Sequence, residues 1–130
     1  MKLSLNKIHH IAIICSDYQQ SKKFYTEILG FEIVQEYYRK ERASYKLDLK
    51  LNGQYIIELF SFPSPPSRLS FPEASGLRHL AFEVDNLVLE LNKLEEAGIP
   101  HEGIRIDELT HKRFTFFSDP DKLPIELYER

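Results

Sequence analysis

The sequence predicts an α+β fold built from two tandem βαβββ modules within a single domain, residues 1–130. The length of 130 residues suits one compact domain and excludes two full ones. Hydrophobic residues at 42% and charged residues at 28% allow an ordinary globular core, which excludes a disordered or fibrous chain. The same order of strand-like and helix-like segments also occurs on both sides of residues 63–72, which hold four of the seven prolines. That stretch has the composition of an extended connector.

The first half of the chain is expected to begin with a strand at residues 8–15, which are short in number, apolar and rich in Ile. A helix is expected at residues 18–29, since apolar residues recur there at helical spacing and Gly30 can end it. Ser16 or Asp17 can cap its start. Further strands are expected at residues 31–38, 44–51 and 54–60. The last two are joined by Asn52-Gly53, a strong hairpin turn signal.

The second half repeats this order. A strand is expected at residues 77–84, followed by a helix at 87–97 that keeps Leu87, Leu91, Leu94 and Ala97 on one face. Asp85 or Asn86 can cap this helix, and Gly98 can end it. Strands are then expected near residues 103–106, at 113–118 and at 123–128, with a turn at 119–122.

Two blocks of the first half recur in the second half at nearly the same offset. The block His10-Ile-Ala-Ile lies 69 residues before His79-Leu-Ala-Phe, and Ile-Glu58-Leu lies 68 residues before Ile-Glu126-Leu. Each block carries one residue that can bind a metal ion, which chance apolar patterning does not explain. The chain is therefore predicted to be an internal duplication, with one module at about 7–62, a connector at about 63–73 and a second module at about 77–130.

Strand alternation places the histidines and glutamates of these blocks away from the predicted helix layer. A strand carboxylate between apolar residues is costly unless it is paired or bound to a metal ion. One strand histidine is usually a structural hydrogen-bonding group and one strand glutamate is usually solvated, but neither explains matching positions in both halves. We therefore predict four metal ligands: His10, Glu58, His79 and Glu126. They suit one divalent ion, with Zn²⁺ or Ni²⁺ expected first and Co²⁺, Mn²⁺ or Fe²⁺ as alternatives, and they leave positions open for substrate.

These residues, together with Phe24-Tyr-Thr-Glu-Ile-Leu-Gly-Phe and Asp119-Pro-Asp, resemble the vicinal oxygen chelate superfamily over nearly the whole chain. The resemblance is to its glyoxalase I-like, or lactoylglutathione lyase-like, members; bleomycin-resistance proteins and dioxygenases belong to the same superfamily. It implies that the paired modules curl into a cupped, barrel-like sheet. It also implies a homodimer with the metal site at the subunit interface, because the ligands commonly come from two protomers. The ligand order His, Glu, His, Glu is that of bacterial glyoxalase I.

The resemblance further implies a metal-dependent lyase or isomerase that stabilises the enediolate of a small α-hydroxy or α-keto carbonyl substrate. In the glyoxalase reaction, the hemithioacetal of methylglyoxal and glutathione loses a carbon-bound proton to a metal-associated glutamate. Glu126 is the expected proton shuttle, and Glu58 is the second candidate. Glutathione-using members usually carry Arg where this chain has Ile14 and Asn where it has Phe62. The hemithioacetal is therefore one of several candidate substrates.

Five residues outside the ligand set are predicted to bind substrate. Lys112 and Arg113 open the penultimate predicted strand and can reach an anionic group, although a solvated pair of cations is an equal alternative. Tyr45, Phe60 and Tyr128 can line a cavity, although aromatic residues in strands most often belong to the core.

Other functions stay open. Epimerase-like, extradiol dioxygenase-like and fosfomycin-resistance-type members keep the metal and change the reaction. A non-catalytic protein that binds an antibiotic or another small molecule is the alternative outside enzymes. His9 is expected to face away from His10 and not to be a ligand, since neighbouring strand residues point to opposite faces.

Composition limits the compartment and the partners. Lys and Arg number 17 against 20 Asp and Glu, a net charge of −3 that disfavours nucleic acid as a partner. Cys15 is the only cysteine, so no internal disulfide can form and a reducing compartment is expected. The chain shows neither a signal peptide nor the roughly 20 apolar residues of a membrane span. A cytoplasmic protein without a membrane partner is expected.

Overall fold

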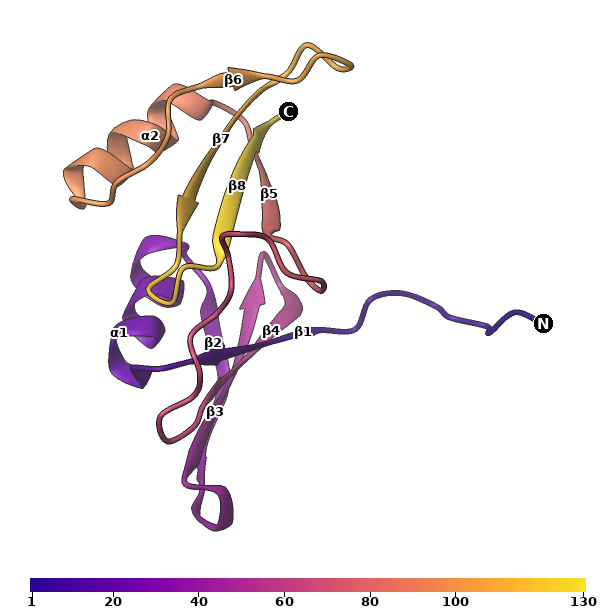
Figure 1. Cartoon of the computed structure of the whole chain (residues 1–130), viewed down its shortest axis with the longest axis vertical. Coiled ribbons are helices and arrows are strands. Elements are labelled where there is room, and N and C mark those ends of the chain that lie inside the picture. Colours follow the sequence, from indigo (N-terminus) through magenta and orange to yellow (C-terminus); the bar gives the residue numbers. More distant parts are fainter. The chain divides into compact units, whose positions relative to one another are not determined.

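The computed structural model describes every residue from Met1 to Arg130. The chain divides into two compact units, Met1–Pro65 and Pro66–Arg130, and each carries one four-stranded mixed sheet (Figure 1). None of the helices has the length and apolar character that crossing a membrane requires. The predicted duplication of a βαβββ order is confirmed, and neither sheet closes into a barrel.

The first unit contains four strands and one interrupted helix. In chain order these are β1 (Ile11–Cys15), α1 (Tyr18–Lys23) with a π-helical continuation (Phe24–Ile28), β2 (Glu32–Arg39), β3 (Ser44–Leu51) and β4 (Gln54–Ser61). The sheet order is β1-β4-β3-β2, in which β1 runs parallel to β4 and the other neighbours are antiparallel. The second unit repeats this plan with β5 (Leu80–Val84), α2 (Leu87–Glu96), β6 (Arg105–Ile106), β7 (Arg113–Ser118) and β8 (Pro124–Glu129), in the order β5-β8-β7-β6.

Local sequence explains where the helices begin and end. The side chain of Asp17 accepts a hydrogen bond from the backbone N–H of Gln20 at the start of α1, and that of Asn86 caps α2 in the same way. The predicted helix over 18–29 departs from α geometry after Lys23, because a π-helical turn follows. The turn brings Phe24 and the following tyrosine into the core together.

The tight turn between β3 and β4 forms at the predicted dipeptide. Asn52 and Gly53 have φ angles of +50° and +79°, which is the pattern of a hairpin turn whose twist matches that of the strands. The hairpin fixes the register of β3 against β4, and this register decides which polar side chains of the two strands face each other.

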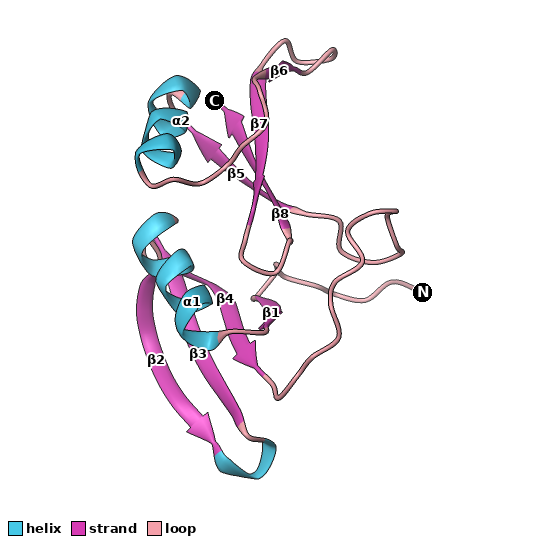
Figure 2. Cartoon of the chain, turned by 60° about the vertical axis from the view of Figure 1, so that its left-hand side comes forward, coloured by secondary structure: helices cyan, strands magenta, loops and turns pink.

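Each helix covers one face of the sheet in its own unit (Figure 2). The side chains between each sheet and its helix, contributed by both, form the core, and they are buried. In the first unit they include Ile13, Leu47, Leu49, Ile57 and Leu59; in the second they include Leu80, Leu87, Leu91, Leu94, Ile125 and Leu127. Because strand side chains alternate, the intervening residues occupy the opposite face, which we call the open face of each sheet.

Two predicted strands begin later than expected. Residues 8–10 and 77–79 lie outside β1 and β5, which start at Ile11 and Leu80. His10 and His79 therefore each stand directly before a strand rather than inside one. These histidines and the residues before them therefore need not alternate between the two faces of the sheet.

Candidate functional site

Strand register places a glutamate on the open face of each sheet in the same way, and a histidine precedes the neighbouring strand at the same distance in both units. In the first unit Ala12 of β1 lies beside Glu58 of β4, and His10 stands two residues before Ala12. In the second unit Ala81 of β5 lies beside Glu126 of β8, and the histidine again stands two residues before the alanine. The two glutamates are thus equivalent in register, and the two histidines are equivalent in their position before the strand.

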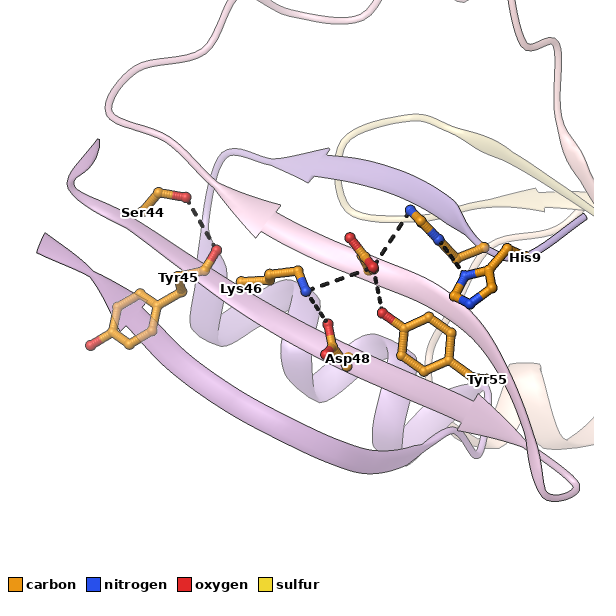
Figure 3. A network of polar contacts seen from close by, with 8 residues as sticks. His9, Ser44, Tyr45, Lys46, Asp48 and Tyr55 are labelled. Atoms are coloured by element: carbon orange, nitrogen blue, oxygen red, sulfur yellow. Dashed lines mark hydrogen bonds and ion pairs between the residues drawn. The ribbon is translucent and has the colours of Figure 1, made fainter. Parts of the chain in front are cut away.

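The glutamate of the first unit sits at the centre of a polar network (Figure 3). The Nε2 atom of His10 lies 3.5 Å from Oε2 of Glu58. The hydroxyl of Tyr55 donates a 2.5 Å hydrogen bond to the same oxygen. The Glu58 side chain is 13% exposed, and burial together with this hydrogen bond raises the pKa of Tyr55. The tyrosine is therefore a neutral donor that fixes the carboxylate.

Lys46 joins this carboxylate to a second one. Asp48 of β3 lies directly opposite Glu58 in the antiparallel β3–β4 pair, and the Lys46 ammonium lies 3.1 Å from Asp48 Oδ1 and 3.6 Å from Glu58 Oε2 (Figure 3). Burial by itself lowers the pKa of Lys46. Hydrogen bonds to Tyr37 and Asp48 and the two negative charges outweigh it, so the pKa lies above its usual value. Lys46 is a cation that lies between two facing carboxylates and offsets their mutual repulsion.

His9 contacts His10, and the expectation that the two face apart is wrong. Their Nδ1 atoms are 2.9 Å apart, and their ring centroids are 5.1 Å apart in an edge-to-face arrangement. Both rings also lie near Tyr55. Residues 9 and 10 precede β1, so strand alternation does not apply to them. His9 is a residue of the site that sequence reasoning missed.

The open face of the second unit is aromatic where the first is charged. Phe116 of β7 lies opposite Glu126, the position that corresponds to Asp48, and its ring meets the ring of His79 edge to face at 5.0 Å. Phe114 lies opposite Tyr128, whose hydroxyl donates a 3.0 Å hydrogen bond to Asp107 and also contacts the Thr110 hydroxyl. His79 therefore contacts an aromatic ring, whereas His10 of the first unit lies against a carboxylate.

Of the five residues predicted to bind substrate, two lie on the open faces. Phe60 is two residues after Glu58 on β4, and Tyr128 is two residues after Glu126 on β8. Tyr45 lies on the helix-covered face of the first sheet, where its ring stacks on that of Tyr18 with centroids 4.3 Å apart. In Figure 3 its side chain points away from Lys46.

The two predicted cations of the second unit are placed differently. Arg113 lies on the helix-covered face, since it alternates with Phe114, and its Nε and Nη2 atoms donate to both oxygens of Glu129 at 2.9 and 2.7 Å. Glu129 also accepts from the backbone N–H of Leu87 at the start of α2. The guanidinium therefore holds the helix to the sheet. Lys112 is exposed in the loop before β7, where its charge contributes to lowering the pKa of Glu129.

Each unit offers a metal ion two ligands of the right chemistry. Two ligands that share an ion through bonds of about 2.0–2.1 Å lie roughly 3.0–3.4 Å apart, and the His10–Glu58 separation of 3.5 Å is close to that. No cluster of three or more His, Cys, Asp or Glu side chains in ligating geometry occurs in the chain. The first unit therefore presents a half-set of two ligands, and the second unit presents the same two residue types, His79 and Glu126.

Comparison with known families identifies the fold. The sequence model of the glyoxalase/bleomycin resistance protein/dioxygenase superfamily matches residues 7–127. The chain belongs to this superfamily. Members of the superfamily, also known as vicinal oxygen chelate proteins, include glyoxalase I, and the tandem βαβββ plan seen here is their fold.

Three members of the superfamily are similar to this chain in sequence or in structure. The protein YwkD of Bacillus subtilis (strain 168), described as uncharacterized, is 65% identical, with 97% of this chain and 98% of YwkD aligned. The crystal structure of a glyoxalase family protein from Enterococcus faecalis has a TM-score of 0.90 and 49% identity, and it covers 98% of this chain and 100% of that one. A protein of Arabidopsis thaliana named Glyoxylase I 4 is 26% identical over 96% of this chain and 71% of its own length.

Proposed function

We propose that the protein is a metal-dependent lyase or isomerase of the glyoxalase I type. The observation that carries the proposal is that both units place a glutamate at the same strand register, with a histidine two residues before the alanine beside it. Membership of a superfamily that contains glyoxalase I supports it. In this proposal His10, Glu58, His79 and Glu126 together hold one divalent ion, Zn²⁺ or Ni²⁺ first. When bound, the ion would supply Lewis-acid polarisation of two neighbouring substrate oxygens.

The two glutamates differ in a way that divides their roles. Glu58 Oε2 accepts from Tyr55 and lies close to Lys46 and His10, so the carboxylate is fixed in position. No hydrogen bond or ion pair holds Glu126, which is half-buried on its own sheet. A base that moves a proton between adjacent carbons must be free to reorient. We therefore assign the proton transfer to Glu126 and a positioning role to Glu58.

The proposed reaction is an internal proton transfer. The Glu126 carboxylate takes the proton from the hydroxyl-bearing carbon next to the substrate carbonyl and returns it to the former carbonyl carbon. The hydroxyl proton moves to the former carbonyl oxygen, so the net change is an isomerisation without an external oxidant. The substrate class is a small α-hydroxy or α-keto carbonyl compound, with the hemithioacetal of methylglyoxal and glutathione among the candidates. Ile14 and Phe62 of the first unit, at positions where glutathione-using members carry Arg and Asn, favour a different thiol or a thiol-free substrate.

The test combines metal content with turnover. Elemental analysis of the metal-loaded protein is expected to give about one divalent ion per protomer, and His10→Ala and Glu58→Ala should lose it. Glu126→Gln keeps an oxygen ligand, and we expect it to retain most of the metal while losing turnover of methylglyoxal hemithioacetals. Unimpaired turnover in Glu126→Gln would contradict the assignment. A bound ion without turnover of any carbonyl compound would favour a binding protein instead.

We further propose a homodimer in the cytoplasm. The support is the family resemblance, in which the two half-sets of ligands commonly come from different protomers. Light scattering after size-exclusion chromatography is expected to give twice the monomer mass of 15.3 kDa. A monomeric mass in the metal-loaded protein would contradict the dimer.

A further inference from the structure

The open face of the first sheet carries a second polar feature beyond the histidine and glutamate. Arg39, the last residue of β2, places its guanidinium carbon 4.7 Å above the ring of Phe60 and 5.8 Å from that of Phe62. The two rings lie nearly parallel, with an interplanar angle of 17° and centroids 6.3 Å apart. Arg42 in the following turn lies 5.9 Å from Phe62. We call these four residues the Arg–Phe cluster.

The cations of the Arg–Phe cluster have no carboxylate partner. Arg39 donates from Nη2 to the Ser44 hydroxyl at 2.9 Å, but its Nε atom is buried without any acceptor. An arginine side chain keeps its charge at all relevant pH values, so this donor cannot be relieved by deprotonation. A buried charged donor without an acceptor is unfavourable, and it indicates that an acceptor is missing.

The second unit provides an internal comparison. Arg105 on β6, the corresponding edge strand, also lies over two phenylalanine rings, Phe114 and Phe116, at 5.1 and 5.2 Å. Its guanidinium, however, pairs with Glu102 at 2.7 Å. Stacking on aromatic rings therefore does not require an unpaired arginine. The absence of a carboxylate beside Arg39 distinguishes β2 from the corresponding edge strand β6.

The Arg–Phe cluster lies on the same face as Glu58 and close to it. Phe60 follows Glu58 by two residues on β4, which is about 6.6 Å along a strand. Ile14 of β1 stands beside Phe60 and is 55% exposed, so the side of this path that faces β1 is apolar, while Lys46 of β3 lies on the other side. An extended substrate chain advances roughly 1.2 Å per bond, so about six bonds span the distance from Glu58 to Phe60 along β4.

We propose that Arg39, with Arg42 beside it, binds the terminal oxyanion of a small substrate whose carbonyl end reacts near Glu58. The oxyanion is a carboxylate or a phosphate, and the short apolar linker lies against Ile14 and Phe60. This inference rests on the proposed function for the carbonyl end. The stacked guanidinium is preorganised, so little side-chain freedom is lost when an oxyanion accepts from it.

The test uses metal-free protein, so it does not depend on metal binding or turnover. Sodium butanoate and methyl phosphate are titrated separately into ¹⁵N-labelled protein, and the Nε–H signal of Arg39 and the backbone amides of Ser44 and Phe60 are followed. Both probes carry an oxyanion and an apolar end, and butanamide is the neutral match for butanoate. We expect a saturating shift with at least one oxyanion and none with butanamide.

Three variants complete the test. Arg39→Gln is expected to weaken binding at least tenfold, and Arg39→Lys, which keeps the charge and guards against loss of folding, should weaken it less. Lys40→Gln removes a charge from the exposed neighbouring position and should bind as the wild type does. Tighter binding of butanoate identifies a carboxylate and tighter binding of methyl phosphate a phosphate.

The outcomes separate the two proposals. Absence of a saturating shift with either oxyanion, or unchanged binding in Arg39→Gln, would overturn the inference even if the protein binds metal and turns over carbonyl compounds. A saturating shift lost in Arg39→Gln, in a protein that binds no metal, would support the oxyanion site and overturn the proposed function instead.

Discussion

Replacement of Lys46 by methionine tests whether the lysine is what allows two carboxylates to face each other. The change removes an ammonium that lies 3.1 Å from Asp48 and 3.6 Å from Glu58 while keeping a side chain of similar length. At an effective dielectric constant of about 20, each contact is worth roughly 5 kcal/mol before desolvation. Breaking a buried ion pair on one side costs about 3–5 kcal/mol.

The exposure of these groups reduces that figure. The side chains of Lys46, Asp48 and Glu58 are 17%, 10% and 13% exposed, so solvent screens part of the interaction. We therefore expect Lys46→Met to lower the free energy of unfolding by about 2–4 kcal/mol at neutral pH. Asp48→Asn in the same chain should recover part of the loss, because it removes one of the two facing charges.

Urea unfolding at equilibrium, followed by circular dichroism, measures the effect through the transition midpoint at constant slope. Lys50→Met is the matched control on the same strand, since its partner Glu32 is 69% exposed at 3.6 Å and such pairs contribute at most about 1 kcal/mol. If Lys46→Met changed stability no more than Lys50→Met, the facing carboxylates would not need Lys46 between them, and the reasoning would be refuted.

Three further predictions concern stability. The hydrogen bond between His101 and the backbone of Glu102, aided by Glu95, raises the pKa of His101, so the stabilisation is complete below the unfolded pKa of about 6.5 and is lost as pH rises through the higher folded value. The melting temperature of His101→Gln should therefore approach that of the wild type at alkaline pH, and a constant difference from acid to alkaline pH would contradict this. Gly53→Ala is expected to cost about 1–2 kcal/mol because residue 53 has a φ of +79°, and a neutral result in urea unfolding would argue against the observed turn. Asp119→Ala removes the acceptor of two backbone N–H groups, those of Asp121 and Leu123, and should cost about 2–4 kcal/mol; hydrogen exchange at these two amides would show whether the loss is local.

Much of the fold follows from short-range sequence signals. The caps, the Asn52-Gly53 turn and the strand alternation need only neighbours within a few residues, and all three form as predicted. The duplication is visible because both halves keep the same polar residues in the same apolar setting. Strand alternation was also sufficient to place Tyr45 on the helix-covered face, since Tyr45 shares that face of β3 with the buried residues Leu47 and Leu49.

The polar contacts around Glu58 depend on the register of the strands and on where they begin, which cannot be read directly from the sequence. Lys46 meets Glu58 only because the turn fixes β3 against β4 in one register. Arg39 of the edge strand β2 reaches Phe60 of β4 across the intervening strand β3. The contact between His9 and His10 depends on the residue at which β1 begins. A shift of one residue in any of these would give different neighbours, and composition alone cannot distinguish the alternatives.

The contrast between Asp48 and Phe116 at one register position bears on how the duplicated halves diverged. Each residue lies opposite a glutamate that the two halves share, yet one is a carboxylate and the other a phenyl ring. The backbone plan was thus retained while the halves specialised, one toward charge and one toward an aromatic surface. A tandem of two first units would carry two charged faces, and a tandem of two second units would carry two aromatic ones. The two halves therefore carry different chemistry at equivalent positions of one backbone plan.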